Sequence, residues 1–124
     1  MKCVFCDEFP QKKEPVLENE LALCYYDEFP VTNGHMLFIT KRHVQTIFET
    51  TVEEKKAIFD LIDKAKLKID KEFHPDGYNI GANCGKYAGQ SVMHVHIHLI
   101  PRYKGDVSNP RGGIRGVIPN KKDY

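Results

Sequence analysis

Three of the six histidines in this chain stand at alternate positions, His94, His96 and His98, with apolar residues between them. Side chains two residues apart on a β-strand point to the same face, so this spacing places three imidazoles side by side. Each imidazole brings a donor and an acceptor that must find partners, which makes the cluster unsuited to simple core packing. Two chemistries fit it: metal ligation by a His-x-His pair, or nucleophilic attack by one imidazole that its neighbours orient.

The loop before the histidines favours phosphate chemistry. It runs from Asn83, which offers an amide, to Ser91, which offers a hydroxyl. Gly89 lets a ligand approach the backbone, and successive backbone amides can bind an anion. An anion-binding loop that leads directly into a histidine-lined strand indicates a phosphate-containing substrate.

The segments Ala88-Gly89-Gln90-Ser91-Val92 and His94 to Arg102 resemble the signature of the histidine triad (HIT) family of nucleotide hydrolases and transferases. Gly34-His35 and the apolar strand after it are also similar, and the resemblance covers roughly residues 3 to 103. It implies a homodimer whose sheets join edge to edge, and cleavage at the α-phosphorus of a nucleotide. Leu99-Ile100-Pro101-Arg102 and the absence of Trp are more similar to the branch that hydrolyses dinucleoside polyphosphates than to the adenosine phosphoramidase branch.

The resemblance also implies a role for each site residue. His96 is the expected nucleophile and forms a nucleotidyl-imidazole intermediate that water resolves. The backbone carbonyl of His94 is expected to hold the second ring nitrogen of His96, and His98 to bond the phosphate or the leaving oxygen. His35 is expected to support the triad from behind. The implied substrate contacts are Asp27 to the ribose, Asn83, Gly89, Gln90 and Ser91 to the phosphate, and Phe5 and Tyr25 to the base.

Cys3 and Cys6 form a Cys-x2-Cys pair near the N-terminus, whereas the other two cysteines show no metal spacing. Two cysteines do not complete a zinc site, because such a site needs four ligands. Some HIT proteins, and the related galactose-1-phosphate uridylyltransferases, add a later histidine and the first triad histidine. That resemblance predicts a structural zinc site at Cys3, Cys6, His43 and His94, with no organic cofactor.

The elements that must position these residues follow from the hydrophobic pattern. Thr51-Val52-Glu53-Glu54 fits a capping box, and apolar residues at three- and four-residue spacing follow it, which predicts a helix over 52–73. Short apolar segments bounded by turn residues predict strands. These are 15–18, 21–26, 35–40, 78–83 and 92–100.

The pattern in the last strand predicts a helix-facing side made of Met93, Val95, Ile97 and Leu99. Strands on both sides of one long helix indicate an α+β domain with an antiparallel sheet and the helix on one face. We expect a single domain over 1–124, with its core at about 3–103 and an irregular tail at 104–124.

Composition narrows the function classes. The 124 residues carry 18 basic and 17 acidic side chains, a balance that argues against a nucleic-acid partner. No apolar run approaches the roughly 18–20 residues that span a bilayer, and the N-terminus lacks an apolar signal region. We therefore expect a cytoplasmic protein with no membrane partner. Two alternatives stay open: a mononuclear metal hydrolase that uses the triad as ligands, and a non-enzymatic nucleotide sensor.

Overall fold

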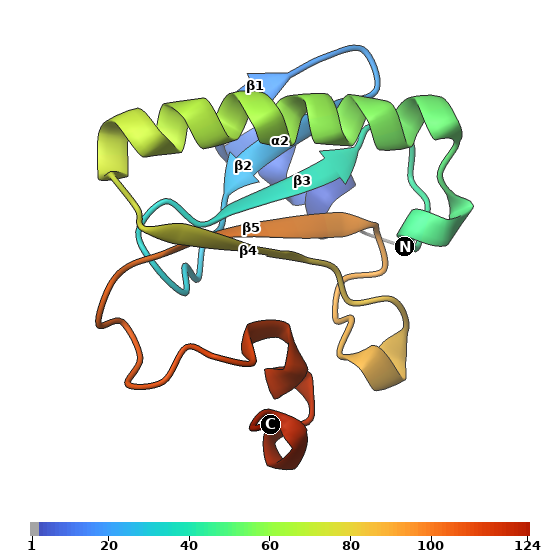
Figure 1. The fold of residues 1–124 in the computed structure, drawn as a ribbon. Helices are drawn as coiled ribbons and strands as arrows, with labels where there is room; N and C mark the ends of the chain where they lie inside the picture. Colours follow the sequence, from blue (N-terminus) through green and yellow to red (C-terminus); the bar gives the residue numbers. More distant parts are fainter. Residues whose placement is uncertain (1–2) are drawn as a thin grey trace.

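The structure is a computed structural model that describes residues 3–124; residues 1 and 2 of the predicted domain lie outside the described part. Five strands form one antiparallel sheet in the order β1-β2-β3-β5-β4, and the long helix α2 crosses one face of it (Figure 1). The α+β prediction is confirmed. The strands are Leu17–Glu18 (β1), Ala22–Tyr26 (β2), Met36–Thr40 (β3), Gly77–Gly81 (β4) and His96–Arg102 (β5), and α2 is Val52–Phe73.

Helix α2 begins and ends where its sequence predicts. The Thr51 hydroxyl accepts the Glu54 N–H at 3.0 Å, and the Glu54 carboxylate accepts the Thr51 N–H at 2.8 Å. Buried Glu54 also binds Arg42 at 2.7 Å, and this bond, with those from Thr51, lowers the pKa of Glu54 to about 2. At the other end His74 turns left-handed, with φ 52°, and Pro75 cannot continue the helix.

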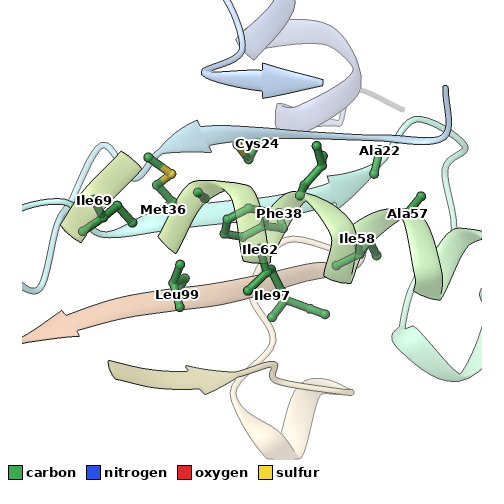
Figure 2. Close-up of a cluster of buried hydrophobic side chains, with 12 residues drawn as sticks. Ala22, Cys24, Met36, Phe38, Ala57, Ile58, Ile62, Ile69, Ile97 and Leu99 are labelled. Carbon is green, nitrogen blue, oxygen red and sulfur yellow. The ribbon is translucent and has the colours of Figure 1, made fainter. Parts of the chain in front are cut away.

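Different elements pack against the two faces of the sheet. The apolar stripe of α2 packs against alternate residues of β2, β3 and β5, including Cys24, Met36, Phe38, Ile97 and Leu99 (Figure 2). The intervening residues of β2 and β3 face the other way, where the N-terminal segment covers them; this second cluster is Phe5, Phe9, Tyr25, Leu37 and Ile39. Since β5 alternates in the same way, His96 and His98 project from the face opposite α2.

Several short helical segments complete the fold. The N-terminal segment is helical over Val4–Glu8 (η1) and Phe9–Lys12 (α1), which the hydrophobic pattern did not predict. The tail after β5 is irregular apart from two turns of 3-10 helix and lies beside the β4 edge of the sheet (Figure 1). No helix within residues 3–124 combines the length and the apolarity needed to cross a membrane. The 3-10 segments are Ile47–Glu49 (η2), Lys86–Ala88 (η3), Gly113–Val117 (η4) and Pro119–Lys121 (η5).

The predicted strand over 92–100 is wrong at its start. β5 begins at His96, because the neighbouring strand β3 ends at Thr40 and its last paired residue, Ile39, lies opposite His96. Before that point the Val95 N–H donates to the carbonyl of Val44 in the loop after β3, at 2.8 Å. Ile97 and Leu99 do face the helix as predicted. Met93 does not: it lies outside the strand, and 38% of its surface is exposed.

Candidate active site

A cleft of about 610 Å³ opens on the sheet face opposite α2, and it is called here the first cleft. β5 contributes two triad histidines, and the loop before it contributes an amide and a hydroxyl. The N-terminal segment and the β2–β3 connection supply the apolar and acidic walls. The lining is Val4, Phe5, Glu8, Phe9, Asp27, Glu28, Phe29, Val31, His35, Leu37, Asn83, Ser91, Val92, His96 and His98.

The middle histidine has a fixed tautomer. Nδ1 of His96 lies 2.8 Å from the backbone carbonyl oxygen of His94. A carbonyl oxygen can only accept a hydrogen bond, so Nδ1 carries a proton, and in the neutral ring Nε2 keeps its lone pair. The ring is 8% exposed and stands edge-on to Phe5, 5.1 Å between centroids. The imidazole is therefore held with one unprotonated nitrogen at the lining of the first cleft.

His35 and His98 form a second oriented pair beside it. The backbone N–H of Val31 donates to Nδ1 of His35 at 3.0 Å, which puts the proton of that ring on Nε2. Nε2 of His35 lies 2.9 Å from Nδ1 of His98 and 3.3 Å from a carboxylate oxygen of Asp27. His35 thus donates to His98, whose own proton moves to Nε2. The pair presents an N–H donor at the cleft and is suited to bonding a phosphoryl oxygen.

Both rings of this pair are neutral near pH 7. Burial, together with the nearby His96 and His35 rings, lowers the pKa of His98 to about 4, although the Asp27 carboxylate acts in the opposite direction. Burial also lowers the pKa of His35, although the Asp27 carboxylate acts in the opposite direction. An unfolded histidine titrates near pH 6.5, so between about pH 6.5 and 4 the unfolded chain binds more protons than the folded chain. Folding stability is complete above this window and is lost as the pH falls through it.

We expect the urea midpoint of the wild type to fall between about pH 6.5 and 4, and the His98→Asn variant to show a shallower fall. Carboxylates also titrate in this range, so the difference between the two slopes is the informative quantity. The exposed His74→Asn variant is the control and should keep the wild-type slope. Equal slopes for wild type and His98→Asn would contradict the neutral, buried state of His98.

A second cluster joins the N-terminal segment to the triad. Sγ of Cys3 and Sγ of Cys6 lie 3.6 Å and 3.4 Å from Nδ1 of His94, and Sγ of Cys6 lies 3.5 Å from Nδ1 of His43. The two Nδ1 atoms are 3.2 Å apart. Tetrahedral zinc with its usual bond lengths sets sulfur and nitrogen ligands about 3.5 Å apart and two nitrogens about 3.3 Å apart. The four predicted ligands thus have the spacing that zinc requires.

The outer hydrogen bond of His94 supports the same conclusion. Its Nε2 lies 2.7 Å from the carbonyl oxygen of Thr40, so Nε2 is the protonated nitrogen and Nδ1 has a free lone pair toward the sulfurs. Burial lowers the pKa of His94, which favours the neutral ring that a metal binds. The chemistry of this donor set therefore fits a zinc ion.

Asp27, His35 and His98 also lie close enough together to surround a cation. Their hydrogen bonding opposes that use. A ligating histidine normally donates its outer nitrogen, whereas the outer nitrogen of His35 accepts the Val31 N–H. Its Nε2 is therefore a donor and not a ligand. This argues against a cation held by Asp27, His35 and His98 together.

Residues 8–105 match the family model described as the HIT domain, which covers more than half of the chain. This chain is a histidine triad protein. The protein named Protein hit from Bacillus subtilis is 43% identical to it over 109 residues, which cover 84% of this chain and 74% of that protein. A solved HIT family structure from Bacillus anthracis superimposes with a TM-score of 0.77 at 42% identity, and covers 84% of this chain and 75% of its own.

Two relatives of this histidine triad protein have names that state an activity, and one solved structure has a title that names a metal. The bis(5'-nucleosyl)-tetraphosphatase of Schizosaccharomyces pombe is 34% identical, covering 86% of this chain and 59% of that protein. The adenosine 5'-monophosphoramidase of the same yeast is 35% identical, covering 82% and 75%. A Zn-bound histidine triad protein from Mycobacterium smegmatis has a TM-score of 0.75 at 33% identity, covering 86% and 79%.

The structure places most of the predicted catalytic and substrate-binding residues at the first cleft, but His94, Gly89, Gln90 and Tyr25 do not line it. Gln90 is buried: its amide accepts the Gly85 N–H and donates to the carbonyls of Gln45 and Val92, so it shapes the loop. Tyr25 is also buried, with its ring 5.0 Å from Phe9.

Phe9 takes the place at the cleft wall that we predicted for Tyr25. The sequence signal was available, because Phe5 and Phe9 are four residues apart, the spacing that places side chains on one helical face. Gly89 does not line the first cleft either. Its φ of 92° is the left-handed conformation that favours glycine, and a side chain added there would face Asn83.

Proposed function

We propose that this histidine triad protein hydrolyses a nucleoside phosphate conjugate, or transfers its nucleotidyl group, at the α-phosphorus through a covalent bond to His96. The observation that carries the proposal is the 2.8 Å contact between Nδ1 of His96 and the His94 carbonyl, which leaves Nε2 unprotonated at the cleft. The resemblance of the chain to named hydrolases supports the same class of reaction. A binding-only sensor would not need a nucleophile in a fixed tautomer.

The steps follow from these groups. Nε2 of His96 attacks the α-phosphorus and forms a P–N bond, while the leaving group departs with the electron pair of its bond to phosphorus. A leaving group that becomes basic takes a proton from water. Water then attacks the same phosphorus, the P–N electron pair returns to Nε2, and one proton is released to solvent. Throughout, the His94 carbonyl stabilises the positive charge on the ring, and the His98 N–H bonds a phosphoryl oxygen.

The first cleft has room for the nucleoside. Phe5 and Phe9 supply aromatic surface for a base, and Asp27 stands in the cleft wall beside the histidines. One Asp27 oxygen already accepts the Phe29 N–H at 2.8 Å, and the carboxylate has lone pairs left for two ribose hydroxyls. Asn83 and Ser91 lie where they can bond the phosphoryl oxygens.

The sequence favours a dinucleoside polyphosphate, but the charges in the first cleft favour a less anionic substrate. The lining contains the carboxylates Glu8, Asp27 and Glu28, and no Lys or Arg from residues 3–124. Behind the lining, Lys12 and Lys13 pair with Glu8 and Glu28, at 3.9 Å and 3.4 Å. Arg111 and Arg115 of the tail both lie against the Tyr124 ring. A polyphosphate would therefore have to bring its own divalent cation, whereas a nucleoside phosphoramidate carries one charge at phosphorus. The phosphoramidase-type activity is our second candidate for this reason.

We further propose that Cys3, Cys6, His43 and His94 hold zinc, which when bound would fix the position of the triad strand and the N-terminal wall. The metal stays outside the chemical steps. The family resemblance also supports a cytoplasmic homodimer. β4 is one of the two edge strands of the sheet, and η4 of the tail lies beside it.

The ribose contact can be tested by binding alone. We expect Asp27→Ala to weaken AMP binding by about 1–3 kcal/mol, roughly 5- to 150-fold, because a charged acceptor is lost. Binding of 2',3'-dideoxy-AMP should change little, since that ligand lacks both hydroxyls. Titration calorimetry measures both, and Asp63→Ala on the exposed face of α2 is the control. Equal losses for the two ligands would show that Asp27 does not bind the ribose.

The reaction itself is tested with a panel of dinucleoside polyphosphates, with and without Mg²⁺, and nucleoside phosphoramidates. Each is incubated with the purified protein, and nucleoside monophosphate is measured. Absence of turnover on every member would leave a nucleotide-binding protein and would contradict the proposal.

A further inference from the structure

We propose that a second cleft receives the leaving group and that Met93 selects against anionic leaving groups there; this inference rests on the proposed function. The second cleft has a volume of about 460 Å³. It lies between the N-terminal segment, His43 and residues 91–93, and the proposed zinc ligands Cys3, Cys6 and His43 form one of its walls. It is a separate cleft from the one that contains His96.

Three residues, Val4, Ser91 and Val92, line both clefts. Ser91 is the phosphate contact proposed above, and His96 lines only the first cleft. A substrate with its nucleoside in the first cleft and its α-phosphorus beside His96 and Ser91 reaches these shared residues at phosphorus. The group attached beyond phosphorus then extends past Ser91 into the second cleft.

Met93 is an apolar side chain that the fold keeps out of the core. Strand alternation would turn it toward α2, but the chain bends before β5 and the Val95 N–H pairs with Val44 instead. Met93 is consequently 38% exposed and lines the second cleft. An exposed methionine in a cleft is a flexible apolar contact for a bound group.

The charge of the second cleft also bears on which leaving group it can receive. Val4, Val92 and Met93 give it apolar walls, and its carboxylate is Asp7. No Lys or Arg within residues 3–124 lines it. Zinc bound by two thiolates and two neutral imidazoles would add no net charge. The cleft therefore suits an apolar or cationic leaving group, and opposes a chain of phosphates.

The test places a positive charge at this position. Two substrates are compared, the 4-nitrophenyl ester of AMP and diadenosine tetraphosphate, without added divalent cation. We expect Met93→Lys to lower kcat/KM about 5- to 10-fold for the ester and to raise it about 5- to 10-fold for the tetraphosphate. The ratio of variant to wild type for each substrate cancels the intrinsic reactivity of its leaving group. Leu67→Lys adds the same charge at an exposed position of α2 and is the matched control.

Competitive inhibition by AMP reports on the first cleft. Its inhibition constant should change less than twofold in Met93→Lys, because AMP has no leaving group, and this also shows that the variant is folded. A similar change for both substrates, or no change for either, would overturn the leaving-group assignment and leave the proposed function intact. Failure of the wild type to cleave either substrate would instead overturn the proposed function, and this inference with it.

Discussion

Replacement of His96 by Asn is expected to lower turnover by at least about 10³-fold while AMP still binds within about threefold of the wild-type affinity. Asparagine is polar and smaller than histidine, so the buried position beside Phe5 and the His94 carbonyl tolerates it. Its amide nitrogen has no available lone pair, so no P–N bond can form. Binding depends on Asp27 and on the aromatic and loop residues of the first cleft, which the substitution leaves in place.

The measurement combines steady-state turnover, calorimetric binding of AMP, and a single-turnover reaction with radiolabelled substrate quenched in base, which preserves P–N bonds. Label should remain on the wild-type protein and be absent from His96→Asn. His74→Asn is the matched control, because His74 is exposed and left-handed, a conformation that asparagine accepts. Retention of more than a few per cent of the wild-type rate by His96→Asn would mean that another group attacks phosphorus.

The second large effect concerns stability. Purified protein is expected to contain about one zinc per chain, and the Cys3→Ser, Cys6→Ser double variant to lose it together with roughly 10 °C of melting temperature. Each half of the cluster lies on a different part of the fold, the N-terminal segment and the loops that flank β3 and β5. Loss of the metal would also leave two Nδ1 lone pairs facing each other at 3.2 Å.

Elemental analysis and thermal unfolding measure these effects, with Cys84→Ser as the control because Cys84 lies outside the cluster. The control should keep both its metal and its melting temperature. Activity of the double variant should fall less than that of His96→Asn, since the nucleophile is intact and only the position of the His94 carbonyl is loosened. Zinc-free protein prepared without chelators, or a double variant as stable as the wild type, would contradict the metal site.

Local sequence signals predicted the helix well because they are complete within a few residues. The capping box at Thr51 and Glu54, and the Pro75 and Gly77 that follow the helix, need no information from the rest of the chain. The limits of β5 depend instead on its partner. Where β3 ends decides where β5 begins, and no residue near Met93 encodes that. The helical N-terminal segment was not predicted because it also depends on distant contacts. Its two phenylalanines are buried against the sheet face opposite α2.

The candidate site was predictable to the extent that its residues fall in contiguous motifs. The His94, His96 and His98 run and the Asn83 to Ser91 loop were visible in the sequence. The structure places His96, His98, Asn83 and Ser91 at the first cleft, and His94 in the cluster with Cys3, Cys6 and His43. The sequence did not show how deeply each side chain would be buried. Gln90 and Tyr25 are buried behind the lining of the first cleft. Hydrogen bonds within the loop hold Gln90 there, and Phe9 packs between Tyr25 and the cleft.

The two faces of strand β5 have different roles: Ile97 and Leu99 pack in the core, whereas His96 and His98 line the first cleft. Insertion or deletion of a single residue in this stretch would exchange the faces, bury imidazoles against α2 and expose the isoleucine and leucine. We therefore expect functional variants of this protein to tolerate changes in length only in the loops and the tail. Within β5, change is limited to substitutions that keep the alternation, and a random deletion library should recover no active clone with a lesion between residues 96 and 99.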